Sequence, residues 1–195
     1  MAHALGVLLA AGAGRRMGGP KALVVGDDAV PWVVSASRAL TAGGCAEVVV
    51  VLGAEARQAA QLLSAEPVGV VVADDWASGL AASLRAGLTA ASSTQAAAVV
   101  LHLVDLPDVG AVVVRRLVDR AGPDALARAS YATGPGHPVL LGRAHWSGVV
   151  VAATGDHGAK AYLDRHDVDL VDCSDLARGL DRDTPEVDGH AQHPR

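Results

Sequence analysis

Short, unbroken runs of aliphatic residues alternate along this chain with longer alanine-rich stretches. Residues 47–52, for example, read Glu-Val-Val-Val-Val-Leu. A strand that is apolar at successive positions must be covered on both faces, as in the parallel sheets of α/β proteins. Such runs predict strands at residues 6–10, 47–52, 68–73, 98–104, 139–141 and 168–171. The stretches between them predict helices at residues 31–42, 54–63, 80–91, 108–120 and 159–165. We therefore expect an α/β fold with a mostly parallel central sheet and helices on both faces.

The chain has enough apolar material for one complete core. Of its 195 residues, 51% are hydrophobic and 19% are charged. A chain of this length buries about 70% of its unfolded surface when it folds, so disorder over most of its length is excluded. We expect a single domain over residues 1–186, followed by a polar tail over residues 187–195 that carries histidine and proline and lies outside the core.

Charge and cysteine content argue against several classes of partner. The net charge of −5 at pH 7 disfavours nucleic-acid binding, which needs clustered Lys and Arg to neutralise phosphates. The two cysteines, Cys45 and Cys173, are too few for a disulfide framework or a zinc cluster.

The apolar segment at 5–13 precedes Arg15 and Arg16, which is the wrong order for an export signal. No apolar run reaches the roughly 18 to 20 residues of a membrane span. We expect a cytoplasmic protein with neither a membrane nor a nucleic-acid partner.

A glycine-rich segment follows the first expected strand. Residues 8–21 read Leu-Leu-Ala-Ala-Gly-Ala-Gly-Arg-Arg-Met-Gly-Gly-Pro-Lys. Glycines allow backbone N–H groups to approach a phosphate chain, and Arg16 and Lys21 add the positive charge that a polyphosphate requires. In open α/β sheets, ligands bind outside the carboxyl ends of the strands. The sequence therefore predicts a phosphate-binding loop at this position.

Two familiar phosphate-binding motifs do not match this segment. Lys21 is followed by Ala22, whereas a P-loop lysine is followed by Ser or Thr. In a dinucleotide fingerprint the third glycine comes three residues after the second, but here Gly18 follows Gly14 by four residues. The second expected strand also leads into Gly53 and not into the carboxylate that would hold a ribose. A dinucleotide-dependent oxidoreductase is therefore the weakest of the alternatives.

The glycine-rich segment resembles the L-A-A-G-x-G-x-R-M-G-x-P-K signature of nucleotidyltransferases, and it is most similar to that of molybdenum cofactor cytidylyltransferases. Five further segments follow in the order found in that family, so the resemblance covers residues 5–186. They are W-A-S-G-L-A-A-S-L-R-A-G-L at 76–88, V-D-L-P-D-V at 104–109, G-H-P-V-L-L at 136–141, G-D-H-G-A-K at 155–160 and D-R-D-T-P-E at 181–186. The resemblance implies a Rossmann-like nucleotidyltransferase fold.

The resemblance also implies a reaction. It is the Mg²⁺-dependent transfer of CMP from CTP to molybdopterin with release of pyrophosphate, and a molybdoenzyme would then receive the product. Three alternatives stay open on the same fold: another nucleoside triphosphate, another acceptor (a sugar phosphate, a polyol phosphate or a different cofactor), or a non-catalytic cofactor-binding chaperone. The oligomeric state is not indicated by the sequence.

The resemblance assigns roles to particular residues. Arg16 and Lys21 would hold the triphosphate and stabilise the leaving pyrophosphate. Nucleotide contacts would come from Leu9, Ala10, Ala11, Gly12, Gly14, Lys21, Ser83 and Arg85. The acceptor would meet His137 and Asp156. Each of these side chains also has a structural alternative: Arg85 as a surface arginine, His137 as a packing residue, and Asp156 as the surface ion-pair partner of Lys160.

Carboxylates near two motifs are the candidate metal ligands. Mg²⁺ prefers one or two carboxylates together with phosphate oxygens and water. Asp105, at the end of the fourth expected strand, is the first candidate. By resemblance Asp183 is the second, with Asp181 as its competitor. The structural alternatives are a helix N-cap for Asp105 and a solvated acidic turn for the other two.

The chain departs from the family pattern at several positions that bear on the substrates. Val104 stands where the family has Gly before the metal-binding Asp, and Leu106 stands in place of Met. The added Cβ of Val104 restricts the backbone where the carboxylate must be aimed. These changes affect the identity of the acceptor more than the reaction class. The L-A-A-G sequence, and Pro20 before Lys21, resemble cytidylyl members of the family and not its guanylyl relative.

Overall fold

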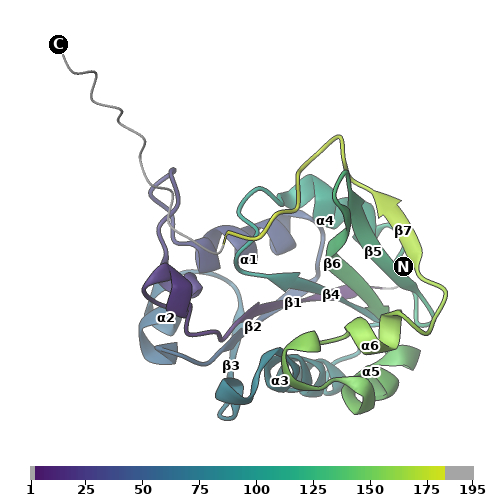
Figure 1. Ribbon diagram of the computed structural model, residues 1–195, viewed down its shortest axis with the longest axis horizontal. Coiled ribbons are helices and arrows are strands. Elements are labelled where there is room, and N and C mark those ends of the chain that lie inside the picture. The colour runs from purple at the N-terminus through teal and green to yellow at the C-terminus, as the bar shows by residue number, and fades with distance from the viewer. Residues whose placement is uncertain (1–2, 183–195) are drawn as a thin grey trace.

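The computed structural model describes residues 3–182 and contains one seven-stranded sheet (Figure 1). The strand order is β3-β2-β1-β4-β6-β5-β7. The strands are β1 (Ala4–Ala10), β2 (Glu47–Leu52), β3 (Gly69–Val72), β4 (Ala98–Leu103), β5 (Leu126–Tyr131), β6 (Gly134–Gly142) and β7 (Asp169–Asp172). Strand β6 runs antiparallel to its neighbours β4 and β5, and the other neighbouring pairs are parallel. The predicted mostly parallel sheet is confirmed.

Helices cover both faces of the sheet, as the apolar strands require. All seven residues of β1 are buried, so neither of its faces contacts solvent. Figure 1 shows α3, α5 and α6 on one side of the sheet and α1 and α4 on the other, and α2 belongs to the same core cluster as α1 and α4 and contacts α1. The helices are α1 (Trp32–Ala42), α2 (Ala56–Leu62), α3 (Leu80–Ser92), α4 (Ala111–Val118), α5 (Trp146–Ala152) and α6 (Lys160–Leu163). No helix within residues 3–182 has the length and hydropathy needed to cross a membrane.

The sequence missed one strand and one helix in the second half of the chain. Strand β5 reads Leu-Ala-Arg-Ala-Ser-Tyr, and its polar positions hide the apolar pattern that marks the other central strands. Strand β6 begins at Gly134, five residues before the predicted start at 139, because its glycines and prolines are typical of loops. Helix α5 contains Gly148 and three consecutive valines, which have low helix propensity.

After β7 the chain returns to the end of β4, where Asp105 lies. This C-terminal segment (173–182) is held by Asp108, whose Oδ2 accepts hydrogen bonds from the backbone N–H groups of Arg178 at 2.8 Å and Gly179 at 3.1 Å. The N–H of Arg182 then donates to the carbonyl of Asp105 at 3.0 Å. Residues 183–195 lie outside the described part of the chain, so the domain boundary at 186 and the tail stay predictions.

Candidate active site

The glycine-rich segment and Asp105 meet because β1 and β4 are parallel neighbours. Their carboxyl ends lie at the same edge of the sheet, and the N–H of Val104 donates to the carbonyl of Leu9 at 3.2 Å. We call residues 10–20, which begin at the last residue of β1, the glycine loop. This edge is where open α/β sheets place their ligands.

The conformation of the glycine loop depends on glycine at two positions. Gly14 has φ +55° and Gly18 has φ +79°, in the left-handed region that other residues rarely adopt. The carbonyl of Gly14 accepts hydrogen bonds from the N–H groups of Met17 at 2.8 Å and Gly19 at 3.3 Å, and a Cβ on Gly14 would collide with the carbonyl oxygen of Gly19. A Cβ on Gly12, by contrast, would meet no described atom within 4 Å. The loop is therefore tight at Gly14 and open at Gly12, where a ligand can approach the backbone.

The structure pairs two predicted site residues that are 84 positions apart in the sequence. Lys21 Nζ lies 2.6 Å from Asp105 Oδ2, and the two side chains are 16% and 17% exposed. The other oxygen, Asp105 Oδ1, is buried and has no hydrogen-bond partner among residues 3–182. A buried carboxylate oxygen without a donor is costly, and a cation would satisfy it. One oxygen of the Asp105 carboxylate is therefore paired with Lys21, and the other remains available as an acceptor.

This geometry fits Mg²⁺ that arrives with a nucleotide. Within residues 3–182 there is no cluster of three or more His, Cys, Asp or Glu side chains that could hold a metal ion, so the described protein does not form a complete cage. Mg²⁺ is commonly held by one or two carboxylates and otherwise by phosphate oxygens and water. Asp105 supplies one open oxygen. Asp181 is exposed, and Asp183 lies outside the described residues, so a second carboxylate stays a prediction.

The predicted nucleotide residues at the end of β1 are buried and backed by a tryptophan. Leu9, Ala10 and Ala11 are at most 4% exposed, which leaves their backbone as the part available for contact. The carbonyl of Ala11 accepts a hydrogen bond from Ala54 N–H at 2.9 Å. A Cβ on the neighbouring Gly53 would strike both this carbonyl and the ring of Trp76. Trp76 thus packs against Gly53, next to the backbone of Ala11.

On α3, the two predicted nucleotide residues are engaged inside the fold. Ser83 is 4% exposed. Arg85 Nη1 donates to the carbonyl of Ala153 at 3.1 Å and so ties α3 to the end of α5. Arg85 is half-buried, so this structural role differs from the surface arginine named as its alternative. A nucleotide contact by either residue stays a prediction.

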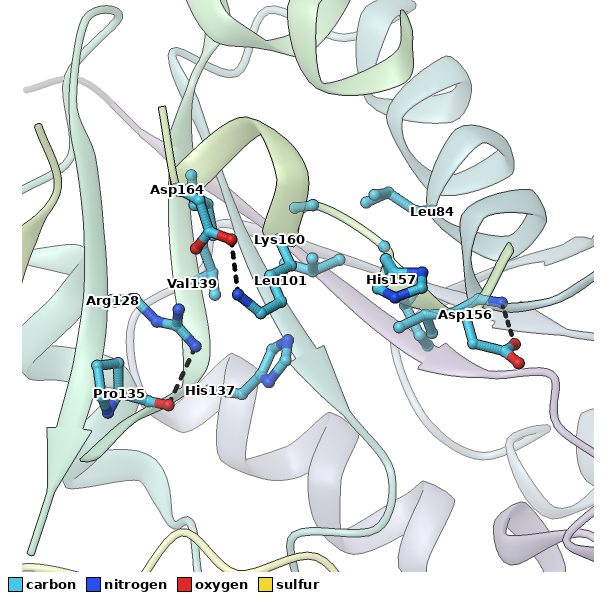
Figure 2. Close-up of a pocket in the computed structure, with 15 residues that line it drawn as sticks. Leu84, Leu101, Arg128, Pro135, His137, Val139, Asp156, His157, Lys160 and Asp164 are labelled. Atoms are coloured by element: carbon cyan, nitrogen blue, oxygen red, sulfur yellow. Dashed lines mark hydrogen bonds and ion pairs between the residues drawn. The ribbon is translucent and has the colours of Figure 1, made fainter. Parts of the chain in front are cut away.

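The two predicted acceptor residues line one cavity of about 500 Å³ (Figure 2). Aliphatic side chains form much of its wall, namely Leu9, Leu80, Leu84, Leu101, Val139 and Leu163. We call this the leucine-lined cavity. Its polar lining consists of Arg128, His137, Asp156, His157, Lys160 and Asp164. The structure thus brings His137 and Asp156 together, and the sequence missed Arg128 because it missed β5.

Asp156 lies at the N-terminus of α3. Its Oδ1 accepts a hydrogen bond from the Leu80 N–H at 3.4 Å, where a negative charge is favoured by the helix dipole. Gly79 has φ +114°, and a Cβ there would strike Asp156. Lys160 pairs with Asp164 at 2.6 Å, so the suggested Asp156–Lys160 ion pair is not what the structure contains.

His137 presents an uncharged imidazole to the leucine-lined cavity. Burial, and secondarily the positive charge of Arg128, lowers the pKa of His137 to about 4. Arg128 itself is fixed by hydrogen bonds to the carbonyls of Gly136 at 3.3 Å and Pro135 at 3.1 Å. The peptide bond between His137 and Pro138 is cis. Tyr131 OH donates to the His137 carbonyl at 2.6 Å, which anchors the backbone that carries the imidazole.

Comparison with known proteins identifies the family of this chain. The model of the MobA-like NTP transferase domain matches residues 6–170, and the chain belongs to this family. It is 39% identical to nicotine blue oxidoreductase of Paenarthrobacter nicotinovorans, over 93% of this chain and 92% of that protein. Among solved structures it is similar to Rv0371c of Mycobacterium tuberculosis H37Rv, with a TM-score of 0.81, 29% identity and 94% and 95% of the two chains covered. A manganese complex of Rv0371c has a TM-score of 0.76 and 26% identity, over 92% and 94% of the chains.

These findings confirm the predicted family and the Rossmann-like nucleotidyltransferase fold. Membership supports nucleotidyl transfer from a nucleoside triphosphate, and the manganese complex of a relative supports the use of a divalent metal. The particular nucleotide, acceptor and metal are finer questions.

Proposed function

We propose that this chain is a cytidylyltransferase that transfers CMP from CTP to the phosphate of molybdopterin and releases pyrophosphate, with Mg²⁺ as its metal. The observation that carries the transferase chemistry is the Lys21–Asp105 pair, 2.6 Å apart beside the glycine loop. It combines a cation for phosphates with a carboxylate that keeps one oxygen open. The choice of CTP and of molybdopterin is supported by the resemblance of residues 8–21 to cytidylyl members of the family.

The proposed step is a displacement at phosphorus. An oxygen of the acceptor phosphate attacks the α-phosphorus of CTP and forms a new P–O bond. The bond between the α-phosphorus and the bridging oxygen breaks, and pyrophosphate leaves with the electron pair. The protein supplies position and charge. Backbone N–H groups of the glycine loop hold the phosphate chain, and Arg16 and Lys21 offset the charge on the departing pyrophosphate.

Asp105 is the residue in the described chain that would hold Mg²⁺, through Oδ1, with Asp183 as the proposed second ligand. When bound, Mg²⁺ neutralises phosphate charge and orients the triphosphate. Lys21 occupies Asp105 Oδ2 before substrate arrives. It is therefore placed to exchange its carboxylate partner for a phosphate oxygen when the nucleotide binds.

Pyrophosphate release tests this proposal. The protein is incubated with molybdopterin, Mg²⁺ and CTP, GTP, UTP or ATP in turn, and melting curves are recorded with each nucleotide with and without Mg²⁺. We expect release and a metal-dependent rise in Tm with CTP alone. Turnover with another nucleotide would replace CTP in the proposal, and turnover with a sugar or polyol phosphate would replace the acceptor. Retained molybdopterin binding without turnover under any condition would favour the chaperone alternative.

A second candidate is an oxidoreductase, favoured by the 39% identity to nicotine blue oxidoreductase. The site offers little for a nicotinamide dinucleotide: β2 leads into Gly53, packed under Trp76, where a ribose-binding carboxylate would be expected. Titration with NADH and NADPH, followed by fluorescence, separates the candidates. Tight binding of either one, combined with no nucleotide-dependent rise in Tm, would favour the oxidoreductase.

A further inference from the structure

The two halves of the C-terminal segment, the yellow chain that leaves β7 in Figure 1, are held in different ways. In residues 173–177, Cys173 is fully buried, and Leu176 and Ala177 pack against the core. In residues 178–182, all of which the structure describes, no residue is buried. Apolar packing therefore fixes the first half, whereas the second half depends mainly on polar contacts.

Asp108 supplies two of these polar contacts through one oxygen. Its Oδ2 accepts hydrogen bonds from the N–H groups of Arg178 at 2.8 Å and Gly179 at 3.1 Å. The ring of Tyr131 also lies so close to Gly179 that a Cβ there would strike it. Hydrogen bonds to an ionised carboxylate are stronger than those between neutral groups. We therefore expect the attachment of residues 178–182 to weaken when the Asp108 carboxylate is removed.

The Asp108 carboxylate is not used to cap a helix. Asp108 shortly precedes α4, and an aspartate beside a helix N-terminus often accepts hydrogen bonds from the first turn of that helix. The N-cap of α4 is Gly110, which has no side chain. Both hydrogen bonds that the structure describes for the Asp108 carboxylate come from the C-terminal segment. Its contacts therefore indicate a role in holding that segment.

The C-terminal segment contacts both aspartates of the V-D-L-P-D-V motif. It passes Asp108 first, and the N–H of Arg182 then donates to the carbonyl of Asp105 at 3.0 Å. Asp105 also carries the open oxygen proposed for the metal, Oδ1. Asp183, the proposed second ligand, directly follows Arg182 in the sequence. One short motif therefore carries the first proposed ligand and the residue that holds the segment leading to the second.

We propose that Asp108 is a positioning residue for the metal site: it holds residues 178–182 against the motif so that Asp183 can bind the same Mg²⁺ as Asp105. In this role Asp108 touches neither metal nor substrate and acts through the C-terminal segment. A segment that is fixed beforehand loses less conformational entropy when a ligand binds. The inference rests on the proposed function, because the nucleotide and the metal belong to that reaction.

The contribution of the metal to nucleotide binding tests this role. Isothermal titration calorimetry gives the Kd of the full-length protein for Mg²⁺–CTP and for CTP with EDTA, without acceptor and hence without turnover. We expect Asp108→Ala to weaken Mg²⁺–CTP binding about tenfold and to change the metal-free affinity less than about twofold. A variant that only disturbed the fold of the nucleotide site would weaken both affinities equally, and that result would overturn the proposal.

Two further variants calibrate the result. Asp108→Asn keeps an oxygen that can accept both hydrogen bonds and should recover most of the affinity for Mg²⁺–CTP. Asp119→Ala changes an exposed aspartate at the other end of α4 and should have no effect. Equal losses in Asp108→Ala and Asp119→Ala would show that the effect comes from charge near α4 and would overturn the role of Asp108.

A double-mutant cycle asks whether Asp108 acts through Asp183. If it does, the variant that combines Asp108→Ala with Asp183→Asn should bind Mg²⁺–CTP no more weakly than Asp183→Asn alone, because the ligand that Asp108 positions is already lost. Losses that add would mean that the two residues act independently, and they would overturn the proposal.

Trypsin measures the attachment of the segment without nucleotide or metal. Cleavage after Arg178, followed by mass spectrometry, requires the segment to leave the surface. We expect Asp108→Ala to speed this cleavage about fivefold, and Asp108→Asn and Asp119→Ala to leave it near the rate of the wild type. An unchanged rate in Asp108→Ala would mean that Asp108 does not hold the segment.

The proposed function and the role of Asp108 fail in different ways. A wild-type protein that binds Mg²⁺–CTP no better than CTP with EDTA would overturn the proposed metal site, and the role of Asp108 with it. A metal-dependent gain in affinity that is the same in the wild type and in Asp108→Ala would overturn only the role of Asp108 and leave the transferase.

Discussion

The glycine loop and the leucine-lined cavity lie at the same edge of the sheet but treat charge in opposite ways. At the glycine loop, the backbone is exposed at Gly12, and Lys21 meets a carboxylate that keeps one open oxygen. In the leucine-lined cavity, Lys160 is paired with Asp164, Arg128 donates to two carbonyl groups, and burial lowers the pKa of His137 to about 4. Leu9 lines the cavity and directly precedes the glycine loop. The contrast divides the proposed reaction into a part that handles phosphate and a part that recognises the body of the acceptor.

The largest effect is expected at the carboxylate of the glycine-loop site. Asp105→Asn removes the negative charge that holds Lys21 and replaces one of the two carboxylate oxygens with an amide nitrogen, which cannot bind a metal ion. We expect turnover to fall about a thousandfold, with molybdopterin binding retained because the leucine-lined cavity does not include Asp105. Pyrophosphate release and titration with molybdopterin measure the two regions in the same preparation. Asp119→Asn, at an exposed position, is the matched control. Loss of molybdopterin binding in the Asp105 variant would show that the regions are not independent.

The buried, uncharged histidines lower the stability of the folded protein in acid, and this loss can be measured. Burial lowers the pKa of His137 to about 4 and that of the fully buried His102 to about 3. As the pH falls below the ordinary value of about 6.5, the unfolded chain takes up these protons first. The free energy of unfolding therefore falls with decreasing pH, by up to about 1.4 kcal/mol per pH unit for each histidine. The loss is confined to pH values below about 6.5.

Urea denaturation at pH 7, 6, 5 and 4.5 checks this prediction. His137→Asn should lose less stability than the wild type over that range, by about 2 kcal/mol at pH 4.5. A pH dependence identical to that of the wild type would mean that His137 is protonated in the folded protein and that the cavity is not charge-balanced in acid.

The next prediction concerns the glycine loop, whose backbone conformation depends on Gly14. Gly14→Ala places a Cβ against the Gly19 carbonyl at a positive φ, which strains the loop. We expect nucleotide affinity to fall about tenfold, while molybdopterin affinity is retained. Gly12→Ala has space for its Cβ and should keep the Tm of the wild type. If both variants melt alike and bind CTP alike, the conformation at Gly14 is not what forms the site.

The sequence predicted the strands that carry the glycine loop and Asp105 far better than those that form the cavity. Strands β1, β2 and β4 are unbroken apolar runs, and the glycines with Lys21 and Asp105 are residue types that few structural roles require together. The pairing of Lys21 with Asp105 follows once β1 and β4 are neighbours. The cavity, by contrast, is formed by leucines that look like ordinary core residues in the sequence.

The missed strand shows why the cavity side could not be predicted. Arg128 interrupts the pattern of β5, and the carbonyls of Pro135 and Gly136 on the adjacent strand accept hydrogen bonds from its half-buried side chain. Such a contact depends on the antiparallel pairing of β5 with β6, which a local pattern does not reveal. The predicted roles of Ser83, Arg85 and Asp183 are not tested by the structure.

The smallest expected effect is that of salt on ligand binding. It is also the most direct measure of how the glycine loop and the leucine-lined cavity differ in charge. Salt screens interactions between exposed charges over a distance of about 10 Å at 0.1 M. Raising NaCl from 50 to 300 mM should therefore weaken CTP binding about fivefold, because the glycine loop attracts a polyanion. Molybdopterin binding should change by only about twofold, because this acceptor carries one phosphate where CTP carries three. Both affinities are measured by titration in the same buffers. A molybdopterin affinity that falls with salt in parallel with that of CTP would mean that the two regions form a single electrostatic site.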